Sequence, residues 1–174
     1  MNKTSWLVLN FSCFVLLVLI SASIQSSLFH WVLGWRPTIQ LSLVFLVYVC
    51  LTRPPIEGFI FVVVTCYCIG LLSVMLTSLN VFNGLCLFVL IQMLRTRVYS
   101  PGPVYFTWTA LAAVFGFHLI AWLTSLFEVR PVAPRPLDWL LEVLLTSLFV
   151  RLVYTFSLWI DKKTKRLSLS ELNS

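Results

Sequence analysis

Long runs of hydrophobic residues, separated by short polar or proline-containing segments, make up most of the chain. A helix of about 20 apolar residues crosses the ~30 Å hydrocarbon core of a bilayer. The pattern therefore predicts an all-α integral membrane protein, one bundle of about six transmembrane helices that forms a single domain over residues 1–174. We expect spans at about 6–24, 38–52, 56–75, 82–94, 104–127 and 137–160, followed by a tail over residues 161–174.

Residues that break helices set the limits of these spans. Pro54 and Pro55 end the second span, which is short, at ~22 Å for 1.5 Å per residue. Asn80 and the pair Asn83–Gly84 indicate a tight turn before the fourth span. The first span could be a signal peptide, but its apolar stretch is longer than the usual ~7–15 residues, so we expect an uncleaved helix.

Composition supports lipid as the solvent of this chain. Hydrophobic residues account for 60% of the sequence and charged residues for 10%, whereas soluble domains carry about 25% charged residues. The formal net charge of +6 could suggest nucleic acid, but the basic residues lie in the expected loops and tail. We therefore expect a membrane environment and no nucleic-acid partner.

The distribution of basic residues predicts the orientation. With both termini on one side, that side holds eight Lys and Arg residues, which are Lys3, Arg53, Arg95, Arg97, Lys162, Lys163, Lys165 and Arg166. The other side holds three, which are Arg36, Arg130 and Arg135. Because cytoplasmic loops are enriched in Lys and Arg, both termini are expected in the cytoplasm.

Arg151 is the most informative residue because it falls inside the sixth span. A charge at the centre of a span costs ~2.5–3.5 kcal/mol on insertion scales. Ser147, Tyr154 and Thr155 share its helix face and form a polar stripe with it. Two interpretations stay open: the stripe faces the bundle or a partner, or Arg151 snorkels to cytoplasmic headgroups.

For other polar residues within the spans, helix packing and ligand binding are alternative roles. His118 is either a hydrogen-bonded core residue or a proton-relay or ligand contact. Glu142 could pair with Arg130 or Arg135 near the outer interface. Asn10, Gln40 and Gln92 are expected to hold helices together by hydrogen bonds, and small residues that include Gly70 and Ser73 are expected to allow close helix packing.

Signals for catalysis and for cofactors are absent from the sequence. The five cysteines lie within or at the ends of the spans, and Cys66 and Cys68 lack the spacing and the second pair of a zinc site. There is no HExxH motif, no phosphate-binding glycine loop and no Ser/His/Asp set. We therefore expect a protein that is not an enzyme and has neither catalytic residues, metal ligands nor cofactors.

Several local features resemble the bacterial rod shape-determining MreD family. They are Arg36–Pro37 before the second span, Glu57–Gly58 opening the third, Gly70–Leu71–Leu72 within it, Gly84–Leu85 in the fourth, and the segment Leu158–Arg166. The chain length, the six short spans and the basic tail are also similar to that family. An acidic residue that is usual in its third span is replaced here by Val74.

The resemblance implies a membrane scaffold of the cell-elongation machinery, which controls rod shape and peptidoglycan synthesis. Such a protein is a multi-pass component of the bacterial cytoplasmic (inner) membrane and binds an MreC-like membrane protein and, through it, the elongation complex. It also implies a likeness in fold to the substrate-binding membrane subunits of vitamin transporters. The alternative is therefore a subunit that binds a small ligand, which would need a polar pocket near the outer face. In the scaffold role, Arg151, Ser147, Tyr154, Thr155, His118, Gly70, Ser73 and Arg36 are the candidate partner or packing residues.

Overall fold

The described part of the chain forms helices and short connections. A computed structural model describes residues 3–25, 39–72, 77–97, 102–127 and 136–164. The helices are α1 (Lys3–Ile24), α3 (Leu41–Thr52), α4 (Pro55–Leu72), α5 (Thr77–Arg97), α6 (Pro103–Ser125) and α7 (Pro136–Lys163). Within the described ranges no residue is in a strand, so the expected all-α class is confirmed.

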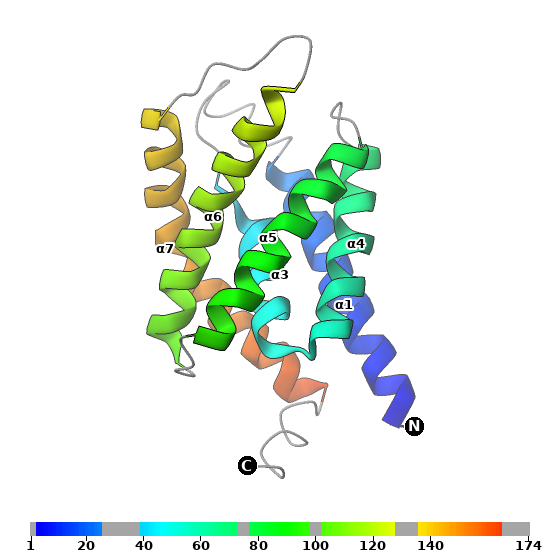
Figure 1. The fold of residues 1–174 in the computed structure, drawn as a ribbon. Helices are drawn as coiled ribbons and strands as arrows, with labels where there is room; N and C mark the ends of the chain where they lie inside the picture. The colour runs from blue at the N-terminus through cyan, green and yellow to red at the C-terminus, as the bar shows by residue number, and fades with distance from the viewer. Residues whose placement is uncertain (1–2, 26–38, 73–76, 98–101, 128–135, 165–174) are drawn as a thin grey trace.

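Four of these helices are long and apolar enough to cross a membrane. They are α1, α5, α6 and α7. The second half of α7 runs obliquely to the other helices (Figure 1). The apolar helices α3 and α4 are shorter. Length and composition thus make the chain compatible with a multi-pass membrane protein.

The short helix α3 lies at the centre of the bundle (Figure 1). It contacts α1, α4, α5, α6 and α7, and its residues Leu43–Cys50 are all buried. A helix that is apolar all round can be buried on every side. The second hydrophobic run therefore forms the core of the described bundle, around which the longer helices pack.

Aromatic rings connect this central helix to its neighbours. The Tyr48 ring stacks on Phe14 of α1, with ring centroids 5.7 Å apart. It also meets the edges of Phe106 of α6 at 6.0 Å and Tyr154 of α7 at 6.1 Å. Offset and edge-on ring pairs of this kind add to the stabilisation from burial.

The turn expected at residues 80–84 is wrong, because these residues lie inside α5. Asn80 donates from Nδ2 to the Cys66 carbonyl of α4 at 2.7 Å. Gly84 lies against Cys66, where an added Cβ would collide with the cysteine side chain. Asn and Gly are thus used here for close packing between helices rather than for a turn, and α5 is longer than the span predicted at 82–94.

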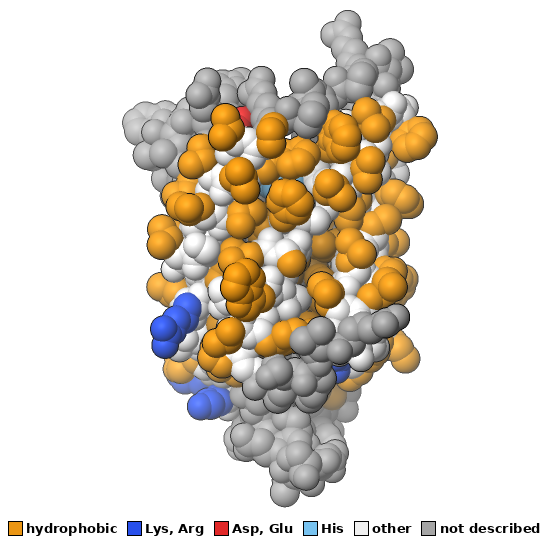
Figure 2. Space-filling view, turned by 60° about the vertical axis from the view of Figure 1, so that its left-hand side comes forward, with side chains coloured by type: hydrophobic (Ala, Val, Ile, Leu, Met, Phe, Trp, Pro, Cys, Tyr) orange, Lys and Arg blue, Asp and Glu red, His pale blue; other side chains and the backbone are white. Residues whose placement is uncertain are grey.

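Hydrophobic side chains also cover the outside of the described bundle. Figure 2 shows one face on which orange side chains, with white atoms between them, cover most of the described surface, and basic side chains lie toward its lower end. Across the described bundle, many large apolar residues are more than half exposed, including Leu137, Leu144, Leu148 and Leu152 of α7. Soluble monomers rarely expose so much contiguous apolar surface, so this exterior fits a lipid environment.

One end of the bundle gathers four chain segments. The start of α1, the connection between α3 and α4, the neighbouring ends of α5 and α6, and the end of α7 lie at this end (Figure 1). Helix α7 extends through Lys163, so the polar tail does not begin at Asp161 as expected. Asp161 is 1% exposed, which makes it part of the core rather than of a solvated tail.

Candidate functional site

Two groups of polar side chains lie inside the bundle, one toward each end. The charged cluster consists of Asn10, Tyr48, Arg53, Asp161 and Thr164, at the end where α7 finishes. The histidine cluster consists of Gln40, His118, Trp139, Glu142 and Thr146, near the start of α3 and of α7. Each cluster joins side chains from three helices or their immediate ends.

The charged cluster is built around an ion pair between Arg53 and Asp161. Arg53 Nη2 also donates to Asn10 Oδ1 at 2.8 Å. Asn10 Nδ2 donates to Asp161 Oδ1 at 2.9 Å and to Thr164 Oγ1 at 2.6 Å. The Tyr48 hydroxyl donates to the second carboxylate oxygen of Asp161 at 2.8 Å, so both oxygens of this carboxylate are hydrogen-bonded.

The local backbone directs Arg53 inward. Arg53 follows the last turn of α3 in an extended conformation, with φ −101° and ψ 158°, which is the region favoured before a proline. Its guanidinium carbon lies 5.5 Å from the centroid of the Phe14 ring, and its carbonyl accepts from Arg95 Nη1 at 2.7 Å. The side chain that begins in a connection therefore ends between α1 and α7.

Burial makes the charged cluster a strong structural link. The side chains of Arg53 and Asp161 are 7% and 2% exposed. A buried charge whose partner is removed typically costs ~3–5 kcal/mol. The cluster therefore holds the end of α7 against α1 and α3.

The histidine cluster brings together α6, α7 and the start of α3. His118 Nε2 lies 2.6 Å from Glu142 Oε2, and the His118 ring stacks on Trp139 with centroids 5.8 Å apart. Gln40 donates from Nε2 to the same Glu142 oxygen at 3.2 Å, and from its backbone N–H to Thr146 Oγ1 at 3.1 Å. The His118 and Glu142 side chains are 16% and 13% exposed, which is more than those of the Arg53–Asp161 pair.

These contacts decide between some of the sequence-based alternatives. His118 is partly buried beside Glu142, but its Nε2 forms no hydrogen bond among the described residues, so its two interpretations stay open. Arg130 and Arg135, the expected partners of Glu142, lie outside the described residues. Asn10 and Gln40 link helices as predicted, and Gln92 of α5 donates to the Cys50 carbonyl of α3 at 3.1 Å.

The stripe around Arg151 does not lie in the bundle interior as a unit. Arg151 and Thr155 are exposed, and the hydroxyls of Ser147 and Thr155 donate to the carbonyls of Leu144 and Arg151 on their own helix. Tyr154 points elsewhere, since its ring packs 4.9 Å from that of Phe106. The part of the hypothesis in which the whole stripe faces the chain's own bundle is therefore wrong.

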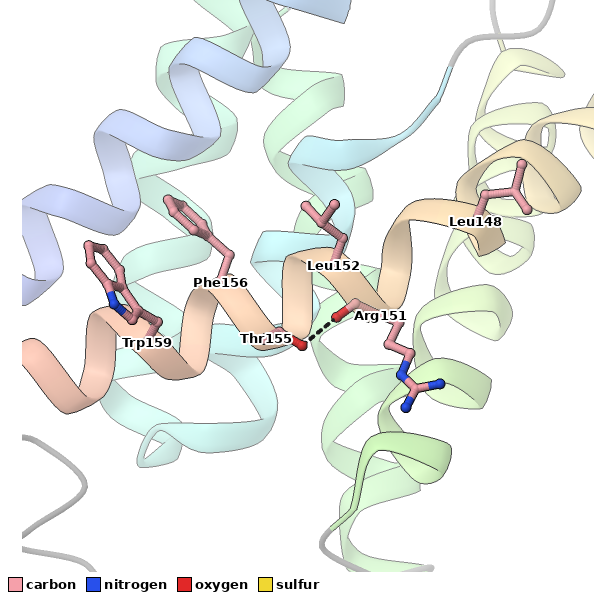
Figure 3. A pocket seen from close by; sticks show the side chains of 6 residues that line it. All are labelled: Leu148, Arg151, Leu152, Thr155, Phe156 and Trp159. Carbon is pink, nitrogen blue, oxygen red and sulfur yellow. Dashed lines mark hydrogen bonds between the residues drawn. The ribbon is translucent and has the colours of Figure 1, made fainter.

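Arg151 instead borders a groove on the outer face of α7. The groove is shallow and open, and residues of α7 alone line it: Leu148, Arg151, Leu152, Thr155, Phe156 and Trp159 (Figure 3). Within the described chain the Arg151 guanidinium has neither a hydrogen bond nor an ion pair. Hydrogen-bond acceptors for this guanidinium must therefore come from another molecule or from solvent.

The remaining predicted residues serve packing or cannot be placed. At Gly70 of α4, an added Cβ would lie 2.9 Å from the Thr77 Cα, so the glycine permits close approach to the start of α5. Ser73 and Arg36 lie outside the described residues. Among the described side chains, no group of three His, Cys, Asp or Glu residues could hold a metal ion.

Sequence reasoning missed the charged cluster. The sequence predicts a loop charge at Arg53 and the start of the tail at Asp161, because each residue directly follows an apolar run. A usable signal was present: Asp161 is an acidic residue at the start of a segment that is otherwise basic, Lys162–Arg166. An isolated charge of the opposite sign beside a span is a candidate for a buried ion pair.

Comparisons with known proteins add no family. No protein-family model matches the chain, and neither a curated protein nor a solved structure shows significant similarity to it.

Proposed function

We propose that the chain is a non-enzymatic scaffold of the bacterial inner membrane that works in the cell-elongation machinery, as MreD-like proteins do. In this role it crosses the membrane six times with both termini in the cytoplasm. It binds an MreC-like membrane protein and, through it, the complex that synthesises peptidoglycan.

The observation that supports a scaffold is that the buried charges pair with each other and with neighbouring helices. Arg53 and Asp161 bind each other and Asn10, and Asp161 also accepts from the Tyr48 hydroxyl, so these polar groups hold α1, α3 and α7 together. A site that binds a charged or polar ligand would instead need polar groups that converge on an open space. Fixed helices with an apolar exterior suit a protein that presents a surface to other membrane proteins.

The second candidate, a membrane subunit that binds a small ligand, is favoured by one observation. The histidine cluster collects Gln40, His118 and Glu142 at the end that we expect to face outward. Its partial exposure leaves these groups closer to solvent than the charged cluster. A polar ligand entering from outside would meet them first.

Deletion of the gene in a rod-shaped host separates the two functions. A scaffold predicts round cells, restored to rods by the wild-type chain, with no new vitamin requirement. Rod-shaped cells that need an added vitamin would favour the transport subunit. In parallel, affinity purification in mild detergent should recover a membrane protein with a single span and the elongation synthases; recovery of the other subunits of a transporter instead would contradict the scaffold.

A further inference from the structure

The groove on α7 combines an apolar floor with one cationic side chain. Leu148 and Leu152 are 69% and 64% exposed and Trp159 is 52% exposed, so the groove is open along its length. The helix changes direction in this region (Figures 1 and 3). Ser147 and Thr155 each donate to a carbonyl of their own helix, a bond that often accompanies bending.

Arg151 leaves the helix away from the leucine side chains. In Figure 3, Leu148 and Leu152 project to one side of α7, whereas the Arg151 guanidinium projects to the other, toward the end where α5 finishes and α6 begins. That is also the end that gathers the basic residues and that we expect in the cytoplasm. The guanidinium is thus directed toward headgroups, and its five donors need acceptors that acyl chains do not offer.

More positive charge lies further along the same helix. Lys163 Nζ lies 4.7 Å from the centroid of the Trp159 ring, and Lys162 is exposed beside it. Trp and Lys at a helix end are typical of the membrane–water interface. The second half of α7 runs obliquely toward this end of the bundle (Figure 1), so each of its residues advances less than ~1.5 Å along the bundle.

We propose that the α7 groove binds an anionic phospholipid of the cytoplasmic leaflet. An acyl chain lies along Leu148, Leu152 and Phe156 on one side of α7, and the headgroup crosses the helix so that its phosphate accepts from the Arg151 guanidinium on the other side. Arg presents a planar set of donors that fits two phosphate oxygens at once. Lys162 and Lys163 add a field that attracts anionic lipids to this end of the helix. The inference needs the membrane placement of the chain but not the scaffold role.

The experiment is native mass spectrometry of the full chain, purified with equal amounts of phosphatidylglycerol and phosphatidylcholine. Wild type should retain phosphatidylglycerol preferentially. Arg151→Leu should reduce that retention roughly tenfold, equivalent to ~1.4 kcal/mol, and Arg151→Lys should reduce it less. Leu152→Trp keeps every charge but fills the groove, and it should also lose the lipid.

Lys162→Leu is the matched control, because it removes the same charge outside the groove. A smaller loss for Lys162→Leu than for Arg151→Leu supports a defined site. Equal losses would show general electrostatic attraction and would overturn the proposal, as would equal retention of the two lipids by wild type. Unchanged lipid retention with loss of a co-purifying protein in Arg151→Leu would assign the groove to a partner helix instead. Thermal unfolding of each variant confirms that it is folded before the comparison.

Discussion

The guanidinium of Arg53 binds the carboxylate of Asp161 across 108 residues of sequence, and both side chains are buried. Asp161 accepts from Arg53, Asn10 and Tyr48, which come from the end of α3, from α1 and from within α3. The contact therefore fixes where the oblique half of α7 ends. It also makes Asp161 the acceptor on which three donors depend.

Removal of this acceptor should destabilise the protein strongly. We expect Asp161→Ala to lower the free energy of unfolding by ~3–5 kcal/mol, because Arg53 would be left as a buried charge without its partner. Thermal unfolding in detergent measures the change. Lys162→Ala, at the exposed neighbouring position, is the control and should leave the melting temperature nearly unchanged.

The double variant Arg53→Met with Asp161→Leu tests the reason for that loss. Apolar residues of similar volume often replace a buried ion pair without cost. The double variant should therefore be more stable than Asp161→Ala. A double variant as unstable as the single one would argue against an unpaired charge as the cause.

Substitution of Asn83 in α5 is expected to stabilise the protein rather than destabilise it. It is 0% exposed, and among the described residues its amide oxygen and nitrogen have no hydrogen-bond partner. A buried polar group without a partner costs ~1–3 kcal/mol. Asn83→Leu should therefore raise the melting temperature, and a marked decrease would show that the amide has a partner in the membrane-embedded protein.

Close packing of α4 and α5 depends on Gly84. A Cβ at this position would collide with Cys66, whereas a Cβ at Gly116 of α6 would meet no atom within 4 Å. Gly84→Ala should lower the melting temperature, and Gly116→Ala should be neutral or stabilising by up to ~1 kcal/mol, because alanine favours the helix.

A second substitution identifies the cause of the Gly84 effect. Cys66→Ala removes the sulfur that the new methyl group would meet. We expect Gly84→Ala combined with Cys66→Ala to recover part of the lost stability. Strictly additive losses in the two single variants would show that the two positions do not contact each other.

The helices themselves could be predicted from the sequence because hydrophobic runs report directly on burial in protein or lipid. The turn expected around Asn83–Gly84 failed for a tertiary reason. Asn and Gly favour turns locally, but here the contacts with Cys66 of α4 keep Asn80 and Gly84 within a continuous helix. Local propensity was overridden by close packing between two helices.

The polar clusters show a different limit. Asn10 and Gln40 could be predicted to bind across helices, because a polar side chain in an apolar span needs a partner. Their actual partners could not be predicted, since the pairs Asn10–Asp161 and Gln40–Glu142 join helices that are far apart in sequence. For Arg151, the predicted contact across helices is itself wrong. Its polar helix neighbours suggest an inward face, but the hydroxyls of Ser147 and Thr155 donate to carbonyls of their own helix.

Topology provides the last prediction. The segments that carry Arg53, Arg95, Lys162 and Lys163 belong to one end of the bundle, where α1 also begins (Figure 1). The positive-inside rule predicts that this end is cytoplasmic. Reporter fusions after Ser174 and within residues 129–136 should therefore report opposite sides, with Ser174 inside, and a fusion within residues 98–101 should agree with Ser174.

Replacing Lys162, Lys163, Lys165 and Arg166 by glutamine changes the count of basic residues from eight against three to four against three. We expect this variant to insert in mixed orientations, because the charge difference that sets orientation nearly disappears. Matching reports from Ser174 and residues 129–136 in the wild type would exclude six crossings, whereas an unchanged orientation in the glutamine variant would show that the tail charges do not set the topology.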